Sequence, residues 1–181
     1  MSLDLIIQKR RSTKAFSDKK ADWRKIIKAI DAARYAPMAG NIFTLKFILI
    51  DNKEKINKIS DACQQDFIKD ASHIVVVCSK PLLAKIPFPE QGEAFLHQQA
   101  GAAIQNILLK LNEQGLATCW IGYFVEDLIR KEIKIPNEVT IEAILPIGHE
   151  SKLKKQNKKI KVDLDSCLTF NSYTEKRMKP I

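Results

Sequence analysis

The chain has 181 residues, of which 45% are apolar, and its formal net charge is +9. A chain of this length buries roughly two-thirds of its unfolded surface, so residues 1–181 are expected to form one domain. No uncharged apolar run approaches the roughly 18 residues of a membrane span, and the N-terminus has no secretory pattern. We therefore expect a cytoplasmic protein with no membrane partner.

Cysteine and histidine spacing gives no indication of a disulfide framework or a metal centre. The four cysteines form no CxxC pair, and the three histidines have no acidic or cysteine partner at ligand spacing. The apolar neighbours of Cys78 and Cys119 favour buried, inert thiols. No metal site is expected.

A basic segment near the C-terminus raises the question of a nucleic-acid partner. Six lysines fall between Lys152 and Lys161, and clustered cations neutralise phosphates. Aromatic residues are not interleaved with them, and no zinc-finger, RNP or KH pattern occurs elsewhere. Residues 152–181 are therefore expected to form a solvated basic tail or arm, with nucleic acid as the less favoured partner.

The first part of the chain predicts two helices and a strand. Ser2 and Asp22 are plausible N-caps, and the residues after each repeat apolar side chains at helical spacing. Pro37 ends the second helix. Residues 38–44 are rich in small side chains and are expected to lie outside the core, and residues 47–50 read as a buried strand.

The middle of the chain predicts a central strand and a long helix. Asn52 is placed to cap a short helix, and the β-branched run over 74–78 is typical of a strand covered on both faces. Residues 80–91 contain three prolines and predict an irregular surface loop. The longest helical pattern runs over 91–114, with Gly115 as its C-cap.

The remaining elements complete a mixed order of helices and strands. Residues 118–122 predict a short strand, 125–133 a helix and 139–145 another strand. After Gly148 the chain becomes polar, and residues 164–173 are expected to form a strand or an arm. This order predicts an α+β fold around one sheet.

Two segments have the composition of ligand-binding sites. Between Arg10 and Phe16, three cations, two hydroxyls and an aromatic ring directly follow the first helix, which favours an anionic ligand. A structural role is equally open, because the helix dipole favours cations at a helix C-terminus. Residues 36–41 carry small side chains that permit close approach of backbone to a ligand, and Asn41 offers both donors and an acceptor.

Together with residues 115–122 and 145–148, these segments resemble the nitroreductase family of FMN-dependent oxidoreductases. Arg11-Ser12-Thr13-Lys14-Ala15-Phe16 is similar to the family's basic-Ser-x-Lys-x-Phe motif, and the resemblance spans roughly residues 6–161. It implies a central, mostly antiparallel sheet flanked by helices and a homodimer with two FMN sites at the subunit interface. It also implies ping-pong electron transfer from NADH or NADPH to a small-molecule acceptor such as a nitro compound, a quinone, an enone or a flavin.

The resemblance assigns parts of the FMN to particular residues. FMN needs cations and hydroxyls at its phosphate, a cation near N1 and O2, and backbone donors near N5. Lys14 is expected at the N1 and O2 edge. The expected cofactor-binding residues are Arg10, Arg11, Ser12, Lys14, Pro37, Met38, Ala39, Asn41, Ile121, Gly122, Tyr123, Lys158 and Lys159. The flavin itself carries the redox chemistry, so no catalytic side chain is expected.

Two departures from the family pattern define the alternative function. Met38 stands where the family has a serine, and Phe43-Thr44-Leu45 stands where it has Gln-Pro-Trp. A hydrogen bond lost at this loop lowers the expected affinity for FMN. The alternative is therefore a flavin-binding or regulatory module with weak turnover. The short segment over 80–91 also predicts an open acceptor pocket.

Overall fold

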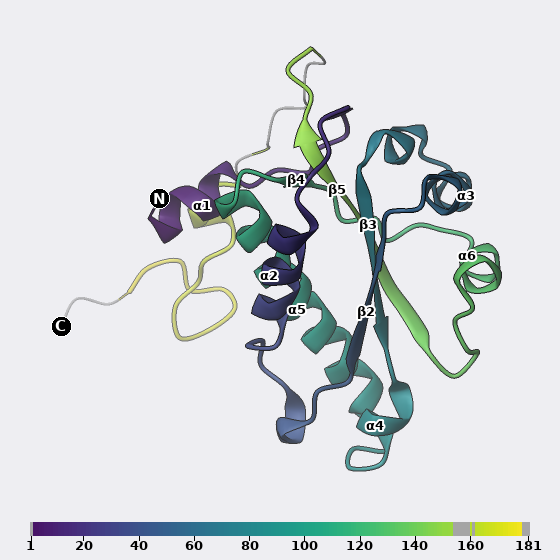
Figure 1. Ribbon diagram of the computed structural model, residues 1–181. Coiled ribbons are helices and arrows are strands. Elements are labelled where there is room, and N and C mark those ends of the chain that lie inside the picture. Colours follow the sequence, from purple (N-terminus) through teal and green to yellow (C-terminus); the bar gives the residue numbers. More distant parts are fainter. Residues whose placement is uncertain (1, 154–159, 161, 179–181) are drawn as a thin grey trace.

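The computed structural model describes residues 2–153, 160 and 162–178. At its centre lies an antiparallel sheet, seen edge-on between two groups of helices in Figure 1. The strand order is β1 (Phe16–Ser17), β5 (Thr140–Glu150), β3 (His73–Ser79) and β2 (Leu45–Ile50), and β4 (Ala117–Thr118) pairs with β5 as well. All seven residues of β3 are buried. The predicted α+β fold and the central position of this strand are confirmed.

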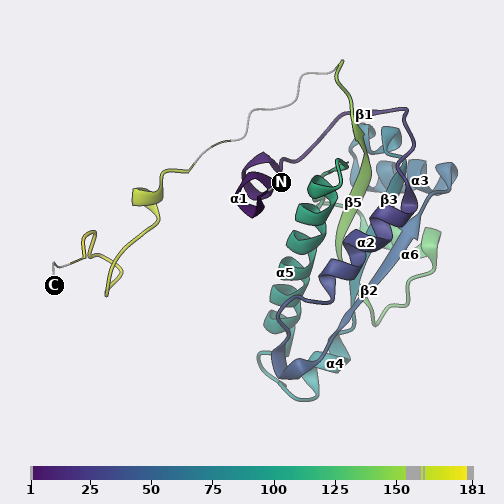
Figure 2. The same ribbon diagram turned by 60° about the vertical axis from the view of Figure 1, so that its left-hand side comes forward.

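Helices cover both faces of the sheet. Figures 1 and 2 show helices lying against each face of the sheet, which explains why the central strands are apolar on both sides. The first pair is α2 (Trp23–Ala33) and α5 (Gly92–Glu113), and the second pair is α3 (Lys53–Cys63) and α6 (Glu126–Ile133). Two shorter helices, α1 (Leu3–Lys9) and α4 (Pro81–Lys85), pack against opposite ends of α5.

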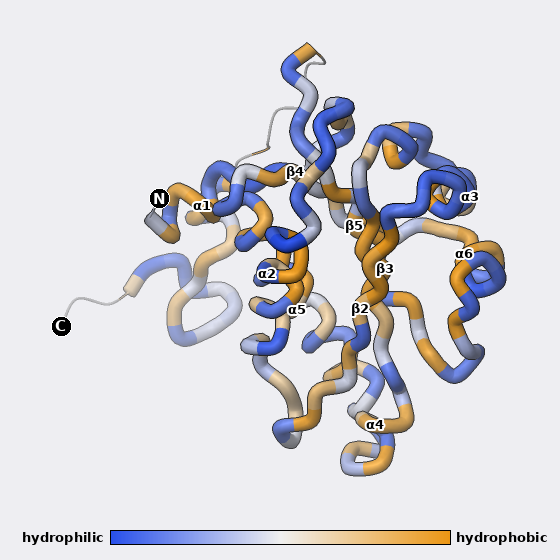
Figure 3. Tube along the Cα trace, in the orientation of Figure 1, coloured by the Kyte–Doolittle hydropathy of each residue, from blue (hydrophilic) through white to orange (hydrophobic). Residues whose placement is uncertain are grey.

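Two apolar cores follow from the alternation of side chains along β5. Ala143 and Leu145 face the core formed with α2 and α5, whereas Ile141 and Ile144 face the core formed with α3 and α6. Figure 3 shows the apolar colour concentrated on β2, β3 and β5, with hydrophilic residues on the outer turns. The sheet therefore holds both helical layers through burial of apolar surface.

The predicted helix starts are confirmed at the level of individual hydrogen bonds. Ser2 Oγ accepts from the backbone N–H of Leu5 at 3.5 Å, and Asp22 Oδ1 accepts from that of Arg24 at 3.0 Å. Asn52 caps α3 in the same way. At the other end of α5, Gly115 follows the last turn with φ +73°, a conformation that glycine adopts without steric cost.

Several predicted boundaries are wrong. Residues 80–91 are not wholly irregular, because Pro81 occupies the first turn of α4, where its missing N–H costs nothing. The strand predicted over 118–122 is reduced to β4, and the chain meets β5 again only through a bridge from Ile121 to Ile144.

The end of the chain also differs from its prediction. β5 does not stop before the polar segment but continues to Glu150, because it pairs with β1 there. Among residues 162–178 there is no strand, and Leu164–Ser166 form a 3-10 turn. Figure 2 shows this segment apart from the sheet and its helices. Two further 3-10 turns span Ala39–Asn41 and Asp66–Asp70.

The prediction that the thiols of Cys78 and Cys119 are buried is confirmed. Burial raises the pKa of Cys63 to about 12 and that of Cys78 to about 11, so both remain protonated at neutral pH. Cys119 is buried too, whereas Cys167 is exposed. Within the part of the chain that the structure describes, no helix has the length and apolar character needed to cross a bilayer.

Candidate functional site

The segment that begins at Arg10 lies across one end of the sheet. The backbone N–H of Thr13 donates to the carbonyl of Thr118 at 3.0 Å, and Ser12 forms a parallel bridge with Thr118. Further along, the carbonyl of Ala15 accepts from Ser151 at 3.0 Å. These bonds fix the basic segment against β4 and the end of β5.

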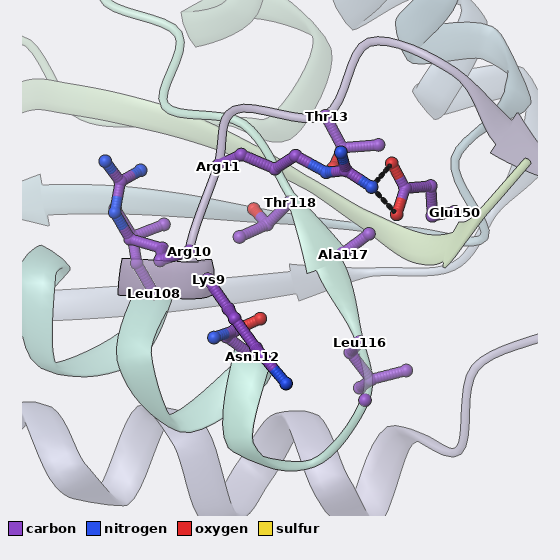
Figure 4. A pocket seen from close by; sticks show the side chains of 11 residues that line it. Lys9, Arg10, Arg11, Thr13, Leu108, Asn112, Leu116, Ala117, Thr118 and Glu150 are labelled. Atoms are coloured by element: carbon purple, nitrogen blue, oxygen red, sulfur yellow. Dashed lines mark hydrogen bonds and ion pairs between the residues drawn. The ribbon is translucent and has the colours of Figure 1, made fainter. Parts of the chain in front are cut away.

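A hollow of about 490 Å³ opens beside this segment, between the end of α1, the last turns of α5 and β4. Figure 4 shows its lining, in which three consecutive cations project in different directions. Polar and charged groups dominate it: Lys9, Arg10, Arg11, Thr13, Asn112, Thr118 and Glu150.

The three cations have different surroundings. Nη2 of Arg11 lies 2.6 Å from each carboxylate oxygen of Glu150, as the dashed lines in Figure 4 mark. The side chains of Lys9 and Arg10 make no ion pair with any residue that the structure describes. An anion entering the hollow therefore meets two uncommitted cations and one that Glu150 already neutralises.

A hydroxyl in the hollow lacks a partner. Thr118 Oγ1 is buried, and no described group forms a hydrogen bond with it. Because buried polar atoms are nearly always hydrogen-bonded, this oxygen indicates a position for a ligand or a water molecule. Cations beside a free hydroxyl are the donor set that a phosphate ester requires, so the residues fit the phosphate of FMN.

Lys14 and Ser12 converge with the residues that follow β4. The Ser12 hydroxyl and the positive charges of Lys14 and Arg10 all act on the Cys119 thiol, although burial dominates and raises its pKa. Lys14 Nζ also lies over the Phe67 ring, 5.9 Å from its centroid. The sheet thus brings the basic segment close to Cys119, two residues before Ile121.

Residues 121–123 offer unused backbone donors. Ile121 is held in place because its N–H and carbonyl both pair with Ile144 at 3.0 Å. Gly122 and Tyr123 donate no backbone hydrogen bond to a described residue, and open space surrounds the position of a Gly122 side chain. This arrangement suits a ring whose edge accepts hydrogen bonds.

The loop over 37–41 has two consecutive residues with a left-handed backbone. Pro37 and Met38 lead into the turn at Ala39, and both Gly40 and Asn41 have left-handed conformations, with φ of +59° and +57°. Asparagine is one of the few side chains that tolerate this region. The Asn41 side chain is exposed and is not tied to the body of the protein.

A buried glutamine holds the end of this loop, which the sequence did not indicate. Gln99 Nε2 donates to the carbonyl of Ile42 at 3.1 Å, and Gln99 Oε1 accepts from the backbone N–H of Thr44 at 3.0 Å. The expectation that residues 38–44 lie outside the core is therefore wrong for Thr44, which is buried.

The structure separates the predicted site residues into two groups. Gln99 anchors the loop near the start of α5, whereas Asn112 lines the hollow near its end, so the two lie roughly 20 Å apart along the helix axis at about 1.5 Å per residue. One chain therefore brings residues 10–14 together with Thr118 and Cys119, but leaves 37–41 near the other end of α5. Lys158 and Lys159 lie outside the described residues.

Three residues of the hollow were not among the predicted cofactor-binding residues. Asn112 donates to the carbonyl of Ile6 at 2.8 Å, a contact that depends on how α1 packs on α5. Glu150 reaches Arg11 across 139 positions of the chain. Thr118, a hydroxyl within an apolar run, could have been recognised as a candidate. Among the described residues, no three His, Cys, Asp or Glu side chains gather closely enough to hold a metal ion.

The fold and the hollow define a class: an α+β protein with helices on both faces of an antiparallel sheet and a cationic hollow of about 490 Å³ at one end of that sheet. The family can then be named. The model of the nitroreductase family matches residues 7–82 and 60–149, and the chain belongs to this family. The resemblance drawn from the sequence is confirmed.

Known relatives are similar over most of their length. A protein from Methanothermobacter thermautotrophicus is 33% identical over 148 residues, which are 79% of this chain and 74% of that protein. One from Archaeoglobus fulgidus is 30% identical over 149 residues, 80% of this chain and 83% of that protein. The names of both suggest NADH dehydrogenase or NAD(P)H nitroreductase activity.

Solved structures share the fold. A nitroreductase family protein from Clostridium difficile 630 superimposes with a TM-score of 0.82 at 30% identity, covering 95% of this chain and 99% of that one. An FMN-dependent nitroreductase from Clostridium difficile R20291 gives a TM-score of 0.75 at 27% identity, covering 93% and 98%. The antiparallel sheet with helices on both faces is thus the fold of this family.

Proposed function

We propose that this chain is an FMN-dependent oxidoreductase that uses NADH or NADPH to reduce nitro, quinone, enone or flavin-type acceptors by a ping-pong mechanism. The observation that carries the proposal is the hollow lined by Arg10 and the unpartnered Thr118 hydroxyl, followed a few residues along the chain by the backbone N–H groups of Gly122 and Tyr123, which donate to no described residue. Family membership and the names of the relatives support the same reaction class.

The cationic end of the hollow would hold the phosphate. Arg10 would supply a guanidinium with several donors and Thr118 a hydroxyl, with Ser12 bridged to Thr118 beside them. Arg11 contributes less in this arrangement, because Glu150 already accepts from it. Residues 10–12 and 118 thereby anchor the cofactor without touching its reactive ring.

The remaining groups would orient and tune the ring. FMN bound here would supply two-electron transfer between a nicotinamide and an acceptor. Lys14 would stabilise negative charge at its N1 and O2 edge, and the N–H groups of Gly122 and Tyr123 would donate toward its N5. No side chain of this set needs to exchange a proton with the ring.

We also infer that the active form is a homodimer. Within one chain, Gln99 holds the end of the loop over 37–41 roughly 20 Å along α5 from Asn112, so the loop does not line the hollow. A second copy that places its loop over the first copy's hollow supplies Pro37, Met38, Ala39 and Asn41 to the cofactor. Each site would then contain residues of both subunits.

A weakly catalytic flavin-binding module is the second candidate. It is favoured by Met38, which replaces a hydroxyl, and by Glu150, which places a carboxylate inside the hollow. Both changes lower the expected affinity for an anionic cofactor.

The test is an absorbance spectrum after incubation with excess FMN and desalting, followed by anaerobic addition of NADH and then NADPH. Retained flavin that bleaches with either donor and recolours with a nitroarene supports the oxidoreductase. Retained flavin that stays oxidised supports the binding module. Absence of retained flavin contradicts both candidates.

A further inference from the structure

Gln99, in the first half of α5, is a buried polar side chain whose hydrogen bonds go to the residues that follow the loop over 37–41. Gln99 and Thr44 are each 4% exposed. Gln99 Oε1 accepts from the backbone N–H of Thr44 at 3.0 Å and from the Thr44 hydroxyl at 2.5 Å. Gln99 Nε2 donates to the carbonyl of Ile42 at 3.1 Å. Both ends of the amide therefore hold the same short segment.

Thr44 is also bonded to the chain beyond β3. Its carbonyl accepts from the backbone N–H of Lys80 at 3.0 Å, directly after the last residue of that strand. A buried network in which the polar groups are bonded is rigid, because each broken bond would leave an unsatisfied group in an apolar setting. The position of Thr44 is thus fixed relative to α5 and to the sheet.

Phe88 supports the middle of the same loop. A Cβ at Gly40 would lie 3.2 Å from Cε2 of Phe88, closer than side chains normally pack. The Phe88 ring makes an edge-on contact with Phe95 on α5, and the two ring centroids are 5.3 Å apart. Both rings and Gln99 line one small cavity under the loop. The loop therefore rests on α5 at two points.

These two supports select the backbone of Asn41. Gly40 and Asn41 have left-handed φ angles of +59° and +57°, which are unfavourable for a residue with a side chain. The backbone N–H of Ile42 closes the turn through a hydrogen bond of 3.1 Å. Gln99 holds Ile42 on one side of Asn41, and Phe88 lies against Gly40 on the other. The exposed amide of Asn41 is thereby presented in one orientation.

We propose that Gln99 is a positioning residue for the cofactor, acting through the loop over 37–41, and that Phe88 assists it. The proposal rests on the proposed function, in which this loop completes the hollow of a second subunit. A loop that already has its binding conformation loses little entropy when the ligand arrives, so the ligand binds more tightly. Asn41 would then offer its amide to the part of the flavin that FMN and riboflavin share.

A double-mutant cycle tests whether Gln99 acts through Asn41. FMN and riboflavin are titrated by fluorescence into full-length wild type, Gln99→Met, Asn41→Gly and the double variant. Gln99→Met keeps the length of the side chain and removes the amide, so it should weaken both ligands about tenfold. In the Asn41→Gly background the same change should weaken them by less than about twofold.

Two other results of the cycle would overturn the proposal. Equal losses in both backgrounds would mean that Gln99 acts independently of Asn41. A loss for FMN without a loss for riboflavin would place the effect at the phosphate, which the loop does not contact in the proposed site.

A milder variant and a matched control separate positioning from general stability. Thr44→Val removes one hydrogen bond and keeps the backbone N–H, so it should weaken both ligands about threefold. Asn106 on α5 donates from Nδ2 to the carbonyl of Ala32 at 3.2 Å, a bond of the same kind that does not hold the loop. Asn106→Leu should leave both affinities unchanged. Losses as large as those of Gln99→Met would contradict the proposal.

Amide hydrogen exchange of the apoprotein gives a readout that needs no cofactor. In Gln99→Met, the N–H groups of Asn41 and Ile42 should exchange about tenfold faster, whereas those of β3 should keep their wild-type rates. A change confined to Thr44, whose own bond is removed, would show that Gln99 does not order the loop. Faster exchange throughout β3 would show general destabilisation and would also count against the proposal.

The same measurements distinguish this proposal from the proposed function. Protein that retains FMN and is bleached by NADH or NADPH, but shows equal losses in both backgrounds of the cycle, remains an oxidoreductase and excludes Gln99 as a positioning residue. Protein that retains no FMN contradicts the proposed function. In that case, faster exchange of Asn41 and Ile42 in Gln99→Met still supports the ordering of the loop by Gln99, and unchanged exchange overturns it.

Discussion

Arg10 lines the hollow with a guanidinium that pairs with no described carboxylate, so its contribution to binding depends on the charge of the ligand. Arg10→Ala should weaken FMN binding by about 1.5–3 kcal/mol, the range for a hydrogen bond to a charged group, and leave riboflavin binding nearly unchanged. Fluorescence titration with both ligands measures this difference. Arg34→Ala removes an arginine paired with Asp31 at the surface and serves as the control. Equal losses for both ligands would mean that Arg10 only supports the fold.

Glu150 places a negative charge where a phosphate is proposed to bind. Glu150→Gln keeps the size of the side chain, frees Arg11 and removes like-charge repulsion, so FMN should bind about fivefold tighter, or about 1 kcal/mol. Riboflavin should bind as in the wild type. Fluorescence titration of the variant with FMN and with riboflavin measures both affinities. Weaker FMN binding in this variant would show that Glu150 positions Arg11 for the ligand.

At the scale of elements, β3 begins with a buried histidine that links stability to pH. Burial lowers the pKa of His73 below its ordinary value of about 6.5, an effect that Asp51 partly opposes and Lys20 reinforces. The unfolded chain therefore binds a proton more readily, and stability is complete above about pH 6.5 and falls as pH drops through the folded-state pKa.

The contribution of His73 to the pH dependence of stability can be measured by urea unfolding of the wild type and of His73→Gln at pH 8 and at pH 5.5. The wild type should lose more free energy of unfolding on acidification than His73→Gln, because the variant has no imidazole to protonate. His149→Gln is a useful comparison, since burial lowers the pKa of His149 too, at a less buried position. An equal loss in the wild type and His73→Gln would exclude His73 as the source.

Elements whose bounds depend on neighbouring residues were predictable from the sequence. Elements whose bounds depend on pairing with segments far away in the chain were not. Helix starts depend on a cap and the residues just after it, so Ser2, Asp22 and Asn52 identified three of them. β4 is short because it pairs only where β5 passes it, which no local pattern encodes. The basic segment of the site was visible as a motif. Gln99, in contrast, reaches Thr44 across 55 positions of the chain.

At the scale of the whole molecule, the proposed homodimer assigns residues of two chains to each cofactor, because the hollow and the loop over 37–41 lie apart in one chain. Differently tagged Arg10→Ala and Asn41→Gly chains can be co-expressed and purified as mixed dimers. Glycine at position 41 removes the amide but accepts the left-handed backbone that Asn41 adopts, with φ +57°. Each homodimer should bind FMN more weakly than the wild type.

The mixed dimer should behave differently from both parents. If each site takes Arg10 from one chain and Asn41 from the other, one site of the mixed dimer carries both changes and the other carries none. Titration should then give one FMN per dimer with wild-type affinity and one much weaker site. If each site belonged to a single chain, both sites would carry one change and neither would reach wild-type affinity. The number of tight sites therefore measures directly whether the loop of one subunit completes the hollow of the other.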